Sequence, residues 1–204
     1  MNLQIGEPPS PSFQQPLALL SDCHRRVERF LGLLARVAAE GRGGLLDRRQ
    51  REALEAALRY FREAAPRHTA DEEESLFPRL RALNSPVARE IMAQMVALER
   101  DHAEANPHHL AVERLGTRWL AEGVLSESDI RALSRHIDHL VALYTVHIGI
   151  EDQMVFPAAG RLLEATSLAE VGQEMAARRG QPFVPAGFVS TNAAREPRTD
   201  HAPA

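Results

Sequence analysis

The stretch "HTADEEESLFPRL", residues 68 to 80, places an imidazole and a carboxylate where a predicted helix should face the core. Counted in steps of three and four, His68 and Glu72 fall on the same stripe as the apolar residues Leu58, Phe61 and Leu76. A buried ion without a partner costs on the order of several kcal/mol. This helix therefore needs a group in the core that offsets the cost of its two polar side chains.

A second copy of the pattern follows 79 residues later. His147 and Glu151, in "HIGIEDQMVFPAA", keep the same spacing, and a Phe-Pro dipeptide again comes shortly after the glutamate. His24 and His102 are related in the same way, with an offset of 78 residues, and each lies on the apolar stripe of its own helix. The repeat predicts two helical hairpins of one design, with their inward polar side chains at one level.

Helix signals divide the chain into four long segments and one short one. The long helices are predicted at residues 16–40, 47–83, 87–121 and 126–164. Four long helices with short connections predict an all-α fold, an antiparallel up-down-up-down four-helix bundle. The expected organisation is a disordered N-terminal segment at 1–14, the bundle at 15–165, and a short helix with a flexible C-terminal tail at 166–204. Ser167 and Glu170 have the spacing of a capping box for the short helix.

Composition excludes several classes of function. The formal net charge of −4 gives no bias toward nucleic acid or an anionic membrane. The single cysteine, Cys23, cannot form an internal disulfide, which favours a reducing compartment. We find no secretory signal, membrane-spanning apolar run, nucleophile triad or phosphate-binding loop. A soluble, cytoplasmic protein of undetermined oligomeric state is expected.

Metal binding is the cheapest way to offset the burial of these side chains. The candidate ligands are His24, His68, Glu72, His102, His147 and Glu151. Residues four apart on a helix lie roughly 6 Å from each other on one face, so each His-Glu pair can reach one metal cluster. Six imidazole and carboxylate ligands without a thiolate favour a dinuclear iron centre over structural zinc. A ferritin-like site is disfavoured, because it needs two Glu-x-x-His motifs and the chain has one.

The order and spacing of these residues resemble the hemerythrin-like, HHE cation-binding domains, over roughly residues 16–164. The resemblance implies an antiparallel four-helix bundle that holds two non-heme irons, bridged by an oxo group or carboxylates, and binds dioxygen or related molecules. Two positions depart from the oxygen carriers. Asn106 stands where they have a fifth histidine, and Glu151 precedes the position, Asp152, where they have an aspartate. The chain therefore looks more like the sensor and catalytic branches of the family.

Three functions remain open from the sequence. The first is a di-iron protein that binds or senses dioxygen, nitric oxide or peroxide, with a possible protein partner for the C-terminal segment that contains Arg178 and Arg179. The second is an enzyme that uses the same cluster on peroxide or oxygen. The third is a metal-poor helical interaction module. The physiological ligand, the number of metals and their resting oxidation state are also left open.

The roles of several polar residues depend on the fold. The possible additional ligands are Asp152, Glu28 and His109. Glu73 and Glu74 are expected on a solvated face, and His136 and His139 at the surface or in hydrogen bonds. His108 has no supporting context. Pro66 and Pro107 fall inside predicted helices and are expected to kink them.

Overall fold

The computed structural model describes residues 12–184. Within that range all regular secondary structure is helical. The elements are α1 (Pro16–Gly41), α2 (Arg48–Glu63), α3 (Ala65–Ala70), η1 (Asp71–Leu76), α4 (Phe77–Arg81), α5 (Pro86–Glu122), α6 (Glu127–Ile150), η2 (Glu151–Val155), α7 (Phe156–Leu162) and α8 (Ala165–Arg178). The all-helical prediction is thus confirmed for this range. Most of the two segments predicted as disordered lies outside the described residues.

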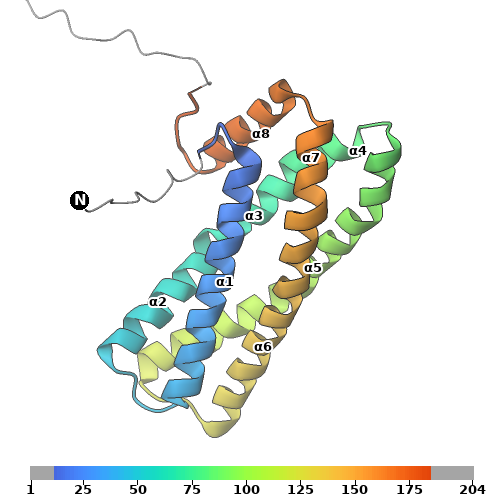
Figure 1. Ribbon diagram of the computed structural model, residues 1–204. Helices are drawn as coiled ribbons and strands as arrows, with labels where there is room; N and C mark the ends of the chain where they lie inside the picture. Colours follow the sequence, from blue (N-terminus) through green and yellow to red (C-terminus); the bar gives the residue numbers. More distant parts are fainter. Residues whose placement is uncertain (1–11, 185–204) are drawn as a thin grey trace, which may run out of the picture.

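Four helical stretches run side by side along one long axis (Figure 1). They are α1, the succession from α2 to α4, α5, and the succession from α6 to α7. The first stretch contacts α2 and α6, and α5 contacts the same two helices from the other side. The short helix α8 lies across one end, where it contacts η1 and α1 (Figure 1).

Local sequence signals explain where the helices begin. The Asp47 side chain accepts a hydrogen bond from the backbone N–H of Gln50, and the Gln50 side chain accepts one from the backbone N–H of Asp47. The Ser126 side chain caps α6. The capping box predicted at Ser167 is wrong, because α8 begins at Ala165 and no side chain caps it. Pro66 lies in the first turn of α3, just after α2 ends, whereas α5 is continuous across Pro107.

The two Phe-Pro dipeptides explain the two π-helical turns, η1 and η2. A proline inside a helix lacks an N–H group, and its ring collides with the carbonyl four residues back. A wider turn relieves this conflict. The backbone N–H of Phe77 reaches the carbonyl of Glu72, and that of Phe156 reaches Glu151, each five residues back. Both predicted glutamate ligands therefore lie in widened turns.

The core consists of two apolar clusters with polar side chains between them. One cluster contains Val27 and Ala105, and the other contains Leu20 and Leu98. On α1 the boundary falls at His24 and on α5 at His102. The buried polar side chains are His24, His68, Asp71, Glu72, Ser75, His147 and Glu151. The fold therefore holds a polar layer across an otherwise apolar interior.

Candidate metal centre

The polar layer brings together all six side chains predicted as ligands. They come from every long stretch: His24 from α1, His68 from α3, Glu72 from η1, His102 from α5, His147 from α6 and Glu151 from η2. None of these side chains is more than 8% exposed. With one nitrogen or oxygen atom taken from each side chain, they form two groups, and within each group these atoms lie within 4.8 Å of one another. One group adds His24 and His68 to the two glutamates, and the other adds His102 and His147.

This layout matches the requirements of two metal ions with shared ligands. Both glutamates belong to both groups, and a carboxylate can bind one cation with each of its oxygens. Metal ions bind imidazole and carboxylate at about 2.0–2.2 Å, so ligand atoms on opposite sides of one ion are about 4.4 Å apart. The separations within each group, all within 4.8 Å, come close to that span, so a small movement of the side chains would bring each group onto one ion.

The bare site leaves several polar atoms without hydrogen bonds. The Nε2 atoms of the four histidines lie 3.0 to 3.7 Å from oxygens of Glu72 and Glu151. Yet both oxygens of each glutamate, and Nε2 of His24 and His147, are buried without a hydrogen-bond partner among the described residues. Buried polar atoms are normally paired, and burying them unpaired is costly. The donor set therefore fits a cation, which would bind these atoms directly.

Electrostatics lead to the same conclusion. Burial, reinforced by the negative charge of Glu151, raises the pKa of Glu72 to about 8. Burial would also raise the pKa of Glu151, but contacts with His147 and His24 outweigh it and hold that pKa below its usual range. Burial lowers the pKa of His68 to about 3. Two carboxylates at this distance resist being charged together, and a divalent cation between them would remove that conflict.

Three carboxylates contact candidate histidine ligands on the Nδ1 side of the ring, away from the two glutamates. The Nδ1 atoms of three histidines face carboxylate oxygens: His24 faces Asp152 at 3.1 Å, His102 faces Glu73 at 2.8 Å, and His147 faces Asp101 at 3.3 Å. An Nδ1–H that donates to a carboxylate leaves Nε2 free to bind a metal, and it fixes the orientation of the ring. Nδ1 of His68 has no such partner among the described residues.

These contacts change the roles expected of Glu73 and Asp152. Glu73 was expected on a solvated face, but its carboxylate holds His102. Asp152 contacts Nδ1 of His24 and accepts a hydrogen bond from Ser21, so it supports a ligand rather than joining the two groups. Glu28 is exposed. The missed signal was an acid directly beside a predicted ligand, since Glu73, Asp101 and Asp152 each adjoin one and support a histidine of another helix.

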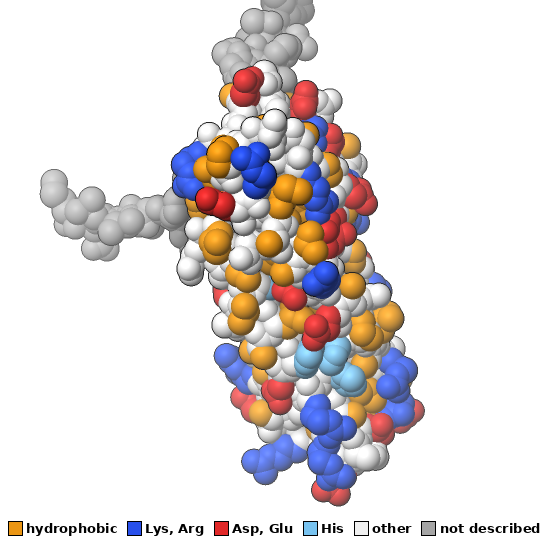
Figure 2. All heavy atoms as spheres, turned by 90° about the vertical axis from the view of Figure 1, so that its right-hand side faces the viewer, with side chains coloured by type: hydrophobic (Ala, Val, Ile, Leu, Met, Phe, Trp, Pro, Cys, Tyr) orange, Lys and Arg blue, Asp and Glu red, His pale blue; other side chains and the backbone are white. Residues whose placement is uncertain are grey.

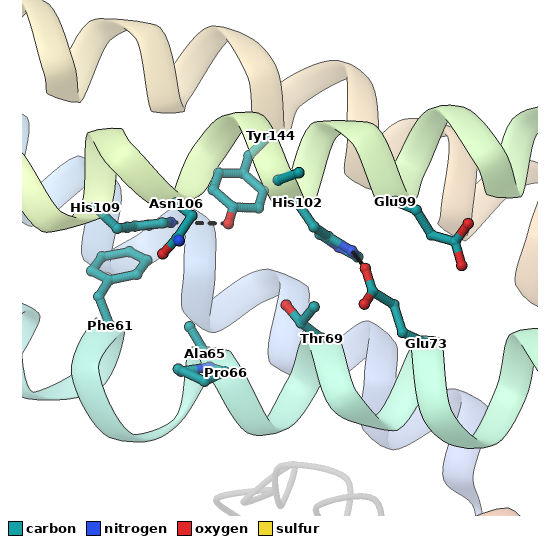
Figure 3. Close-up of a pocket in the computed structure, with 11 residues that line it drawn as sticks. Phe61, Ala65, Pro66, Thr69, Glu73, Glu99, His102, Asn106, His109 and Tyr144 are labelled. Atoms are coloured by element: carbon teal, nitrogen blue, oxygen red, sulfur yellow. Dashed lines mark hydrogen bonds and ion pairs between the residues drawn. The ribbon is translucent and has the colours of Figure 1, made fainter.

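A cavity of about 390 Å³ adjoins His102 (Figure 3). Its lining includes Asn106, His109 and Tyr144, and Nε2 of His109 is hydrogen-bonded to the Tyr144 hydroxyl at 3.0 Å (Figure 3). His109 is therefore held away from both ligand groups, and burial lowers its pKa to about 4. The cavity is large enough for a diatomic molecule or peroxide beside the candidate centre.

The end of α8 is tied to the centre through Asp71. This carboxylate is fully buried, immediately before Glu72, and accepts hydrogen bonds from Arg178 at 3.0 Å and Arg179 at 2.6 Å. Helical periodicity does not predict this pairing, because 107 positions separate Asp71 from Arg178. The contact joins the C-terminal helix to a π-helical turn that carries a candidate ligand.

Fold and site together define a helical cation-binding protein. Residues 15–159 match the hemerythrin HHE cation-binding domain, and the chain belongs to this family. It is also similar to an "uncharacterized protein" of Haemophilus influenzae, with 31% identity over 183 residues, which are 87% of this chain and 98% of that protein. Within residues 12–184, no helix has the length and apolar character needed to cross a membrane.

Proposed function

We propose that this chain holds two non-heme iron ions and uses them to bind or sense dioxygen, nitric oxide or peroxide. The proposed ligands are His24, His68, Glu72, His102, His147 and Glu151. The observation that carries the proposal is the pair of ligand groups with both glutamates in common, whose oxygens have no hydrogen-bond partner among the described residues. Iron bound there would supply a redox-active pair of ions with coordination positions for a small ligand.

The surrounding residues support this function in three ways. Asp152, Glu73 and Asp101 hold three histidines in the orientation that binding requires. The cavity beside His102 admits a small molecule, and the hydroxyl of Tyr144 can serve it as a hydrogen-bond partner. Apolar clusters flank the polar layer on both sides, and none of the proposed ligand side chains is more than 8% exposed.

The contacts of α8 favour sensing over storage or structural binding. A change in how Glu72 binds metal would move η1, and Asp71 in η1 would pass that movement to Arg178 and Arg179. We infer that the up-down-up-down bundle acts in the cytoplasm and presents the C-terminal segment to a protein partner. The alternative of an enzyme acting on peroxide uses the same centre and differs in showing turnover.

The test is iron content with the visible spectrum, on protein loaded with ferrous iron under nitrogen and then exposed to air. We expect two irons per chain and the bands of a bridged ferric pair. Glu72→Ala and Glu151→Ala should lose iron, whereas Glu74→Ala, at an exposed position of the same π-helical turn as Glu72, should keep it. Equal iron in all three variants would refute the ligand assignment.

A challenge of the loaded protein separates the remaining functions. Sensing would be supported if nitric oxide or peroxide causes a single change in the spectrum without further turnover, and if the protease sensitivity of the C-terminal segment changes with it. Continuous consumption of peroxide would support the enzyme. No bound iron in a fully helical protein would favour the metal-poor interaction module instead.

A further inference from the structure

A second group of histidines lies on the outer surface of α5 and α6, where imidazole side chains gather in one patch (Figure 2). The rings of His108 and His139 stack with centroids 3.8 Å apart, and His136 contacts the same His108 ring edge to face. Glu104, one turn before His108, places a carboxylate oxygen 2.9 Å from Nε2 of His139. These four side chains share none of their members with the buried centre.

The nitrogen positions suit a metal ion. Nδ1 of His108 and Nδ1 of His136 are 3.2 Å apart. Two imidazole ligands of a tetrahedral zinc ion, each at 2.0–2.1 Å from the metal, have their nitrogens about 3.3 Å apart. The two nitrogens therefore already have the separation of neighbouring ligands, and they come from two different helices.

A second contact supplies further donors beside this pair. Nε2 of His139 is shielded from solvent and makes no hydrogen bond among the described residues, although Glu104 lies over it. The His139 ring stacks on the His108 ring. To bind an ion held by His108 and His136, the partly exposed His139 side chain would have to rotate. The carboxylate of Glu104, exposed and one turn before His108, is the other candidate for completing the set of ligands.

The surroundings of the two histidines favour the neutral imidazole, which is the form that binds a metal ion. Burial, together with the neighbouring His139, lowers the pKa of His108, and burial, together with the neighbouring His108 and Arg135, lowers the pKa of His136. Neutral imidazole prefers late divalent transition metals such as zinc.

We propose that His108 and His136 form a surface site for a divalent cation of the zinc class, completed by Glu104 or His139. The ion would join α5 to α6, the helices that also carry His102 and His147 of the buried centre. Because the site forms only in the folded chain, its ion would also stabilise the fold. The proposal does not depend on the identity of the buried metal.

The test is titration of the full, metal-free chain with zinc, followed by NMR of the imidazole nitrogens. We expect the Nδ1 signals of His108 and His136 to shift together, in addition to any signals of the buried histidines. Unchanged signals of both rings at saturating zinc would overturn the proposal. This measurement needs no substitution, so a folding defect cannot obscure it.

The number of zinc ions bound per chain, and the zinc affinity of variants, provide an independent test. On protein whose buried centre has first been loaded with iron, the wild-type chain should bind one additional zinc. His108→Ala and His136→Ala should lower that affinity at least about tenfold, and Asp138→Ala should not. Asp138 is an exposed acid of the same helix that faces α1 beside Ala35. Equal zinc affinity in all variants, with unchanged iron content, would refute the surface site without affecting the proposed function.

Discussion

Replacing Glu73 by alanine tests how the buried centre is held together. The carboxylate of Glu73 accepts a hydrogen bond from Nδ1 of His102 at 2.8 Å and binds no metal in the proposed arrangement. Loss of such a supporting group typically lowers metal affinity by about 10- to 100-fold. The Glu73 side chain is 35% exposed, so water can partly replace it. We therefore expect a loss of about tenfold, equivalent to about 1.4 kcal/mol.

The assay is competition for ferrous iron against a chromogenic chelator under nitrogen. Glu74→Ala is the matched control, because Glu74 is the next residue, is 66% exposed and contacts Arg178 rather than a histidine. Glu73→Gln should retain most of the affinity, since its amide oxygen can still accept the hydrogen bond from His102. If Glu73→Ala binds iron as tightly as Glu74→Ala, His102 is not held through Glu73 and the reasoning fails.

Three further predictions concern the fold around the centre. Asp71→Asn should lower the free energy of unfolding in urea by about 3 kcal/mol, because it leaves two arginines without their buried counter-charge. It should also speed tryptic cleavage after Arg178, and unchanged cleavage would contradict the anchoring role. In the metal-free protein, His109 has a pKa of about 4 when folded and about 6.5 when unfolded. The unfolded chain therefore binds more protons between those values, and about 2 kcal/mol of stability should be lost from pH 7 to pH 5; His109→Gln should remove that part, and an identical pH dependence would refute it. Gly172→Ala should destabilise by on the order of 1–3 kcal/mol, because its methyl group would meet the backbone carbonyl of Phe13; an unchanged thermal midpoint would show that the N-terminal turn moves freely.

The sequence predicted which polar side chains lie in the core, because helical periodicity reports which residues face inward. His68 and Glu72 share a stripe with apolar neighbours, and that stripe is buried as expected. The internal repeat then linked this pair to His147 and Glu151. Family membership and an all-helical fold follow from the same spacing, which is why both predictions are confirmed.

The supporting contacts could not be predicted by the same reasoning. Glu73 and Asp101 lie beside the inward stripe, and only the rotation of neighbouring helices decides whether such a residue meets water or an imidazole. The pairing of Asp71 with Arg178 depends on where α8 packs, which periodicity within one helix does not report. Periodicity also does not predict that the surface histidines meet, because His108 and His136 lie on different helices, 28 residues apart.

The number of residues in the two π-helical turns, η1 and η2, decides which side chains face the buried centre. An α-helix rotates by about 100° per residue, so an extra residue in one turn shifts the phase of everything that follows. Because of the shift in η1, His68 before the turn, Glu72 within it and Leu80 after it all face inward. Deleting a residue of η1 other than Glu72 would leave every proposed ligand in the chain, yet it would rotate one half of the helix against the other. Insertions and deletions in these two turns should therefore be tolerated far less well than substitutions at their exposed positions.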